Sequence, residues 1–137
     1  MFNLDELNRV GVGYLPGHLG IVLTHAASGE VWAELTIKPH LLAPNGYLHA
    51  GTVVSLADTA CGYGCMLTLP AGANGFTTLE LKSNHLSTAT NGLLICNATV
   101  THQGKNTQVW EATVKHSETD KILALFRCTQ MILYPKA

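Results

Sequence analysis

The sequence predicts an α+β fold in which an antiparallel sheet of about six strands wraps around one long central helix. A mostly apolar segment covers residues 50–68, and as a helix it would be about 28 Å long at ~1.5 Å per residue. Later segments are rich in β-branched and aromatic residues and are separated by short turn sequences. Because an antiparallel sheet can have one apolar face, such a sheet can pack along the helix.

The composition limits the classes of protein to consider. The 137 residues are about the length of one domain, so we expect a single domain over residues 1–137. A net charge of -1, with 8 basic residues and no basic run, argues against nucleic acid or a membrane surface as a partner. Hydrophobic residues make up 47% and charged residues 12%, which indicates apolar surface that another subunit covers.

The expected location is the cytoplasm. Residues 1–6 carry acids where a signal peptide has bases. Residues 52–69 are interrupted by Asp58, glycines and hydroxyls, which favours a buried helix over a membrane span. The four cysteines show no Cys-x-x-Cys pair, as expected in a reducing compartment. Cys61 and Cys65 could be zinc ligands only with two further donors, so we interpret them as small core residues.

Local patterns predict the first half of the chain. A short amphipathic helix is expected over residues 3–10, and residues 11–17 break it. An apolar run at residues 20–25 and an alternating segment at residues 31–38 predict a β-hairpin. Two prolines then delimit a loop that leads to the central helix.

The second half reads as consecutive strands. They are expected over residues 76–86, 93–103, 108–117 and 122–134. Asn91–Gly92 and residues 104–106 have hairpin-turn composition. The sequence therefore predicts an antiparallel meander after the helix.

Asp58 is the one charged residue inside the central helix. Desolvation of a carboxylate is unfavourable, so such a residue has either a structural partner or a functional role. The residue type alone leaves both possibilities open.

The start of the helix offers a second chemical group. His49, Ala50 and Gly51 lie where the first backbone amides have no partner within the helix. With the helix dipole, these amides can bind a polarised carbonyl oxygen, and small side chains let a substrate approach. The pattern is compatible with an oxyanion hole.

The spacing between these groups suggests a shared site. Gly51 and Asp58 are seven residues apart, so they lie on one helical face separated by about 10 Å. A reacting carbonyl cannot lie within ~3 Å of both groups on one helix. If both act on one substrate, the site lies across a subunit interface.

Residues 45–64 resemble the hallmark of hotdog-fold acyl-CoA thioesterases of the phenylacetate-degradation (PaaI-like) group. That hallmark is Gly-x-x-His-Gly-Gly followed by an acid nine residues after the histidine, and Gly46, His49, Gly51 and Asp58 stand at these positions. Ala50 replaces the first glycine of the pair. The resemblance extends over residues 31–133 and includes the strand at 77–87 and the turn at 104–105.

The resemblance implies roles for individual residues. Asp58 would be the catalytic carboxylate, acting as general base on water or as nucleophile. The Ala50 amide would polarise the thioester oxygen from the other subunit, with Gly51 beside it. Thr78 would help place the water, and His49 would shape the loop near the carbonyl. Two loop residues would contact the substrate: Asn45 and Gly46.

The expected function is hydrolysis of an aryl- or medium-chain acyl-CoA to the free acid and CoA by a homodimer or homotetramer. No metal or cofactor is implied beyond the coenzyme A of the substrate, and acyl-carrier protein is the less favoured thiol carrier. The alternative is a non-catalytic acyl-CoA binding module with the same fold. A serine triad is disfavoured because Ser55 lacks the Gly-x-Ser-x-Gly turn. A hydratase would need a histidine and acid pair placed differently.

Overall fold

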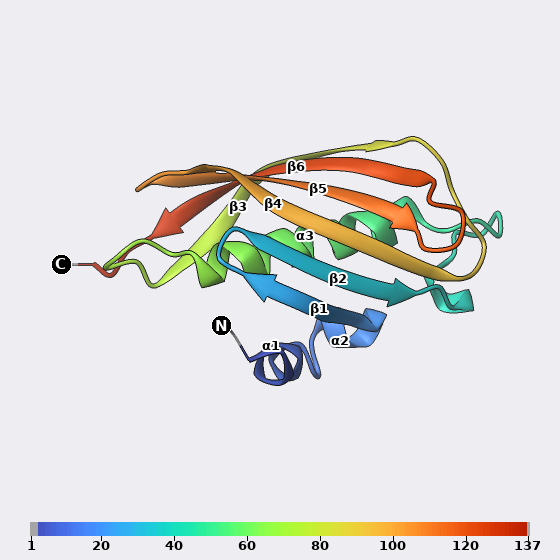
Figure 1. The fold of residues 1–137 in the computed structure, drawn as a ribbon, viewed down its shortest axis with the longest axis horizontal. Coiled ribbons are helices and arrows are strands. Elements are labelled where there is room, and N and C mark those ends of the chain that lie inside the picture. Colours follow the sequence, from blue (N-terminus) through green and yellow to red (C-terminus); the bar gives the residue numbers. More distant parts are fainter. Residues whose placement is uncertain (1–2, 137) are drawn as a thin grey trace.

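One six-stranded antiparallel sheet wraps around helix α3 (Figure 1). The structure is a computed structural model that describes residues 3–136. The strands are β1 (Ile21–Ala27), β2 (Glu30–Thr36), β3 (Gly75–His85), β4 (Leu93–Gln103), β5 (Thr107–His116) and β6 (Ile122–Leu133). The helices are α1 (Leu4–Val10), α2 (Leu15–Leu19), the 3-10 turn η1 (Pro39–Leu41) and α3 (Ala50–Leu67). The predicted α+β hotdog architecture is confirmed.

The strand order is β1-β2-β4-β5-β6-β3. The predicted β1–β2 hairpin and the β4–β5–β6 meander are both present. The expectation that Asn91–Gly92 closes a hairpin between β3 and β4 is wrong, because β4 pairs with β2 and β3 pairs with β6 at the sheet edge. Residues 86–92 instead carry the chain around the end of the sheet (Figure 1). Gly92 packs against the ring of His116 there, with φ +101°.

The N-terminal helices α1 and α2 lie beside strand β1, at that edge of the sheet (Figure 1). The predicted helix at residues 3–10 is confirmed as α1, whose first amides donate to the Asn3 side chain. Asn8 fixes α1 to β1 through two hydrogen bonds with the Leu23 backbone, at 2.8 and 3.0 Å. Helix α2 was not predicted, because residues 11–17, which include Pro16, are expected to break the helix. At the first turn of a helix, however, proline is well tolerated.

Helix α3 is buried along one face, and its other face is only partly covered. The buried residues pack on the sheet: Thr52, Val53, Leu56, Ala57, Ala60, Cys61, Gly64 and Cys65. On the other face, Asp58 and Tyr63 are half-buried and Met66 is 39% exposed. The partial cover follows from the curvature of the sheet, which reaches around one side of the helix only.

Close packing fixes the C-terminal half of α3 on the sheet. An added Cβ on Gly64 would lie 2.4 Å from the Trp110 ring, so glycine is what allows the indole to approach. Trp110 is fully buried, and its indole N–H donates to the Gln108 side chain at 2.8 Å. Among residues 3–136, no helix is long and apolar enough to cross a membrane.

Candidate functional site

His49 is the N-cap of helix α3. Its backbone is extended, and its Nδ1 accepts a hydrogen bond from the Gly51 amide at 2.7 Å. An added Cβ on Gly51 would lie 2.9 Å from this Nδ1 atom, so the cap itself requires a glycine. The Gly51 amide is therefore engaged by His49.

The Ala50 amide is the available donor at the start of the helix. The Thr52 and Val53 amides both donate to the His49 carbonyl, at 3.0 and 3.4 Å. Within residues 3–136, the Ala50 amide donates to no protein acceptor, and Ala50 is exposed. An unpaired N–H at the positive end of a helix dipole is suited to bind a carbonyl oxygen that gains negative charge.

Asn45 and Gly46 form the turn that precedes this helix. The Asn45 side chain accepts from the Tyr47 amide at 3.1 Å, and Gly46 has φ +87° and donates from its amide to the Ala43 carbonyl at 2.9 Å. Both residues are exposed. These contacts give both residues a role in the turn, and contact with a substrate stays a prediction for them.

Asp58 lies in the middle of α3 on its partly covered face. Its Oδ1 atom is buried and has no hydrogen-bond partner within residues 3–136. Burial raises the pKa of the Asp58 carboxyl above its ordinary value. A carboxylate without a structural partner argues against the structural interpretation and favours the functional one.

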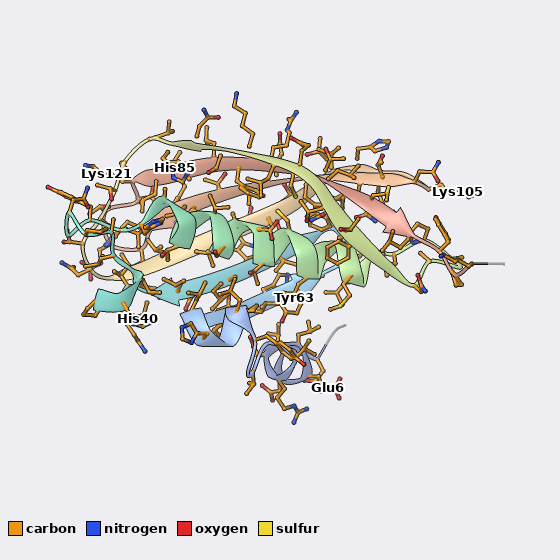
Figure 2. The ribbon with its side chains drawn as sticks, turned by 180° about the vertical axis from the view of Figure 1, so that it is seen from behind. Glu6, His40, Tyr63, His85, Lys105 and Lys121 are labelled. Atoms are coloured by element: carbon orange, nitrogen blue, oxygen red, sulfur yellow. The ribbon has the colours of Figure 1, made fainter. Side chains whose placement is uncertain are left out.

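A cavity of about 300 Å³ opens beside Asp58. Its wall is mostly apolar and comes from α1, α2, α3 and β3: Val10, Pro16, Thr59, Gly62, Tyr63, Met66 and Phe76. Figure 2 shows Tyr63 on the side of α3 that faces the N-terminal helices. The N-terminal contribution was missed because helix periodicity does not reveal which groove a helix covers.

Thr78 lies on the edge strand and points toward the interior side of the sheet. Its hydroxyl donates to the side-chain oxygen of Gln130 at 2.7 Å. Gln130, which is fully buried on β6, was also missed. Its position is one where an apolar residue is expected in an alternating strand, and that departure could have revealed it.

The structure separates Ala50 from Asp58 as the spacing predicts. Both lie on the uninterrupted helix α3, and eight residues correspond to about 12 Å along its axis. One chain therefore brings Asp58 together with the apolar cavity but keeps it away from the Ala50 amide.

Two other sets of residues lie outside this site. A cavity of about 530 Å³ is on the opposite face of the sheet and contains the Arg127–Glu111 ion pair, but none of the predicted site residues. The four cysteines are free and buried in the core, and burial raises the pKa of Cys65 and Cys96 to about 12. Thiols that stay protonated suit core packing better than metal binding. No group of three potential metal ligands occurs in residues 3–136.

Comparison with known proteins identifies the class. Residues 45–123 match the Thioesterase superfamily, and the chain belongs to this family of thioester hydrolases. It is 35% identical over 111 residues to a 1,4-dihydroxy-2-naphthoyl-CoA hydrolase of Listeria monocytogenes, covering 81% of this chain and 89% of the relative. A putative esterase of Haemophilus influenzae is 31% identical, covering 96% and 94%.

Solved structures agree with this assignment. A thioesterase of Haemophilus influenzae superposes with a TM-score of 0.90 at 28% identity, covering 98% of this chain and 92% of the other. The PaaI protein of the Escherichia coli phenylacetic acid degradation operon superposes with a TM-score of 0.77 at 27% identity, covering 86% and 83%. The resemblance to hotdog thioesterases is confirmed.

Proposed function

We propose that the protein hydrolyses acyl-CoA thioesters at a site that combines Asp58 of one subunit with the Ala50 amide of a second. The observation that carries the proposal is that two unsatisfied groups lie on one helix at a separation that a single carbonyl cannot bridge. A buried carboxylate oxygen and a free helix-start amide are the two groups that hydrolysis of a thioester requires.

The reaction proceeds through water as nucleophile. Asp58 takes a proton from the water as its oxygen attacks the thioester carbon, and the carbonyl electron pair moves onto oxygen, where the Ala50 amide donates to it. The tetrahedral intermediate then collapses, and the carbon–sulfur bond breaks. The proton passes from Asp58 to the CoA sulfur, giving the free acid and the CoA thiol. These steps use no metal or cofactor.

The second subunit is expected at the free edge of β3. Every position of β3 is exposed or half-buried, and Leu79 and Leu81 are 55% and 42% exposed. An edge strand that exposes two leucines and has no partner on its outer side, next to a partly covered helix, is a surface that another subunit commonly covers. We propose a homodimer that pairs at this edge, alone or as half of a tetramer.

The cavity beside Asp58 is the proposed acyl pocket. Its aromatic and aliphatic walls fit an aryl or medium-chain acyl group. Coenzyme A is the proposed thiol carrier because two relatives, from Listeria monocytogenes and Escherichia coli, are named as CoA-thioester hydrolases. The cytoplasmic location stays a prediction.

Replacing Ala50 with proline should lower kcat by roughly 100 to 1000-fold. Proline deletes the proposed donor but is favoured at the first helical position. The extended backbone of His49, with φ -69° and ψ 133°, suits a residue that precedes proline. Thiol release from a panel of acyl-CoAs gives the rate. Ala50→Gly keeps the amide and should stay within about tenfold of the wild type.

The same variant tests whether the site is shared. Ala50→Pro and Asp58→Asn chains, co-expressed with different tags, form mixed dimers in which one site is intact and the other carries both changes. We expect about half of the wild-type activity per mixed dimer, although each variant alone is inactive. Mixed dimers as inactive as their parents would contradict a shared site.

The pH dependence of kcat/KM should reflect the raised pKa of Asp58. The general base must be ionised, so kcat/KM should fall as the pH drops through the Asp58 pKa, with a midpoint above the ordinary value of 3.8. A thiol reagent that reacts in acid, such as 4,4'-dithiodipyridine, allows the measurement. A midpoint at or below 3.8 would argue against Asp58 as the base.

A non-catalytic module would behave differently in these assays. It would bind acyl-CoA without releasing thiol above the buffer rate, whichever acyl group is offered. Turnover by the wild-type protein that depends on Asp58 excludes this alternative.

A further inference from the structure

A row of polar side chains crosses the interior face of the sheet near the C-terminal end of α3. In the strand register, Gln103 of β4 pairs with Gln108 of β5, which pairs with Gln130 of β6, which pairs with Thr78 of β3. Gln108 and Gln130 are both fully buried. Burying an amide in a core is unfavourable unless its hydrogen bonds are satisfied.

Gln108 has a structural reason to be there. Its Oε1 accepts from the Trp110 indole at 2.8 Å and from the Thr68 hydroxyl at 3.2 Å. Its Nε2 donates to the Thr68 carbonyl at 3.0 Å, and Thr68 is the C-cap of α3. Gln108 therefore holds the end of the helix and the large core indole.

Gln130 has no comparable role in holding the fold. Its Oε1 accepts from the Thr78 hydroxyl at 2.7 Å, and its Nε2 has the Cys128 sulfur as partner, at 3.4 Å. Sulfur is a weak acceptor. An apolar side chain of the same size would satisfy the core at least as well, so stability does not explain this amide. Its one strong contact is with Thr78.

The hydrogen bond to Gln130 determines whether the Thr78 hydroxyl donates or accepts on its other side. A hydroxyl has one proton, and Thr78 gives its proton to Gln130. Toward the open side of the strand, the Thr78 oxygen can then only accept. The register shift that follows Thr78 is a β-bulge, and such bulges redirect side chains next to functional sites.

The course of β3 places Thr78 on the Asp58 side of the contact between Phe76 and helix α3. An added Cβ on Gly62 would be 3.3 Å from the Phe76 ring, so β3 contacts α3 at that pair. Figure 2 shows β3 running back across α3 toward its N-terminal end. From Phe76 to Thr78 the strand advances about 6.6 Å, and from Gly62 back to Asp58 the helix advances about 6 Å. Because these two distances are similar, the step from Phe76 to Thr78 leads from the level of Gly62 toward that of Asp58.

We propose that Gln130 is a positioning residue for hydrolysis, which holds the Thr78 hydroxyl as an acceptor so that Thr78 and Asp58 together orient the attacking water. The water donates one hydrogen bond to Thr78 and its other proton to Asp58, and its lone pair points at the thioester carbon. This inference rests on the proposed function. Gln130, which is buried on the neighbouring strand β6, therefore affects kcat through Thr78.

The test is a double-mutant cycle on Gln130 and Thr78 in the full-length protein, with kcat measured on an acyl-CoA that the protein hydrolyses. Gln130→Met keeps the size of the side chain but removes the acceptor, and we expect kcat to fall on the order of tenfold with KM unchanged. Thr78→Val should give a similar loss, and the double variant should lose no more than either single variant. Thr78→Ser keeps the hydroxyl and should recover most of kcat.

Gln108→Met is the matched control. It removes the neighbouring buried amide, so it should lower Tm while the folded protein keeps its kcat. If Gln130→Met does not fold, Gln130→Asn, whose amide is one methylene too short to reach Thr78, should show the same loss of kcat.

Three outcomes would overturn the inference. They are an unchanged kcat in a folded Gln130 variant, a loss that adds fully to that of Thr78→Val, and a loss that Gln108→Met reproduces. Wild-type turnover that depends on Asp58 in the same assays would show that the proposed function stands even where this inference fails. A wild-type protein that releases no thiol would instead refute the proposed function.

Discussion

Asp58→Asn should lower thiol release by roughly 100 to 10,000-fold, because an amide of the same shape cannot take a proton from water. The structural reason is specific to this residue. Asp58 is the carboxylate beside the apolar cavity, and its buried Oδ1 has no hydrogen-bond partner within residues 3–136. Loss of kcat with substrate binding retained would assign the residue to chemistry rather than to binding.

The same substitution should make the protein more stable at neutral pH. Burial raises the pKa of Asp58 in the folded state, so the folded chain binds this proton more tightly than the unfolded chain. The free energy of unfolding therefore decreases as the pH rises from the ordinary value toward the raised one, and it stays lower above it. Asparagine carries no charge, so the variant does not pay the desolvation cost of the buried carboxylate. The Tm of the Asp58→Asn variant should therefore exceed that of the wild type at neutral pH.

Thermal unfolding at several pH values checks the second half of this prediction. The stability gained by Asp58→Asn should shrink as the pH is lowered toward 3.8. Glu118→Gln, which changes an exposed acid between β5 and β6, is the control and should alter neither rate nor Tm. An Asp58→Asn variant with wild-type turnover would refute the proposed mechanism.

Gly64→Ala should be the most destabilising small substitution in helix α3. The new methyl group would lie 2.4 to 2.9 Å from three atoms of the Trp110 ring. The ring cannot move away easily, because it is fully buried and is hydrogen-bonded to Gln108 at 2.8 Å. Overpacking of this kind costs about 2 kcal/mol or more, against a total stability of about 5 to 15 kcal/mol.

Urea or thermal unfolding measures the effect, and we expect Tm to fall by at least about 6 °C. Gly62→Ala, at a half-buried position of the same helix, is the matched control. Its Cβ would meet only the end of the Phe76 ring, at 3.3 Å, and alanine favours the helix by about 1 kcal/mol over glycine. Equal stability of the two variants would mean that the Gly64–Trp110 contact does not limit the packing.

Local sequence patterns were sufficient for most of the elements. The helix at residues 50–68 was predicted almost to its ends, because an apolar segment between turn sequences has few other stable conformations. The β1–β2 hairpin and the β4–β5–β6 meander followed from short turns between strands that are neighbours in the chain. The α2 helix was missed because Pro16 has opposite meanings at the start and in the middle of a helix.

The position of β3 needed the tertiary structure. Asn91–Gly92 has the composition of a hairpin turn, but composition does not say which strands pair. With β3 beside β6, the backbone groups on the outer edge of β6 have hydrogen-bond partners, and β4 can pair with β2. This pairing joins residues far apart in sequence, so the hydrophobic surface of the whole sheet decides it rather than any local signal.

The sequence by itself determined the two candidate reacting groups and their separation, because helix rise is a fixed property of the backbone and the resemblance to hotdog thioesterases marked Asp58. Only the tertiary structure decided which of these groups have hydrogen-bond partners. It engaged the Gly51 amide with His49, left the Ala50 amide open, built the cavity from the N-terminal helices and placed Gln130 behind Thr78. Hydrogen-bond partners and burial depend on contacts between distant segments, and these contacts exist only in the folded chain.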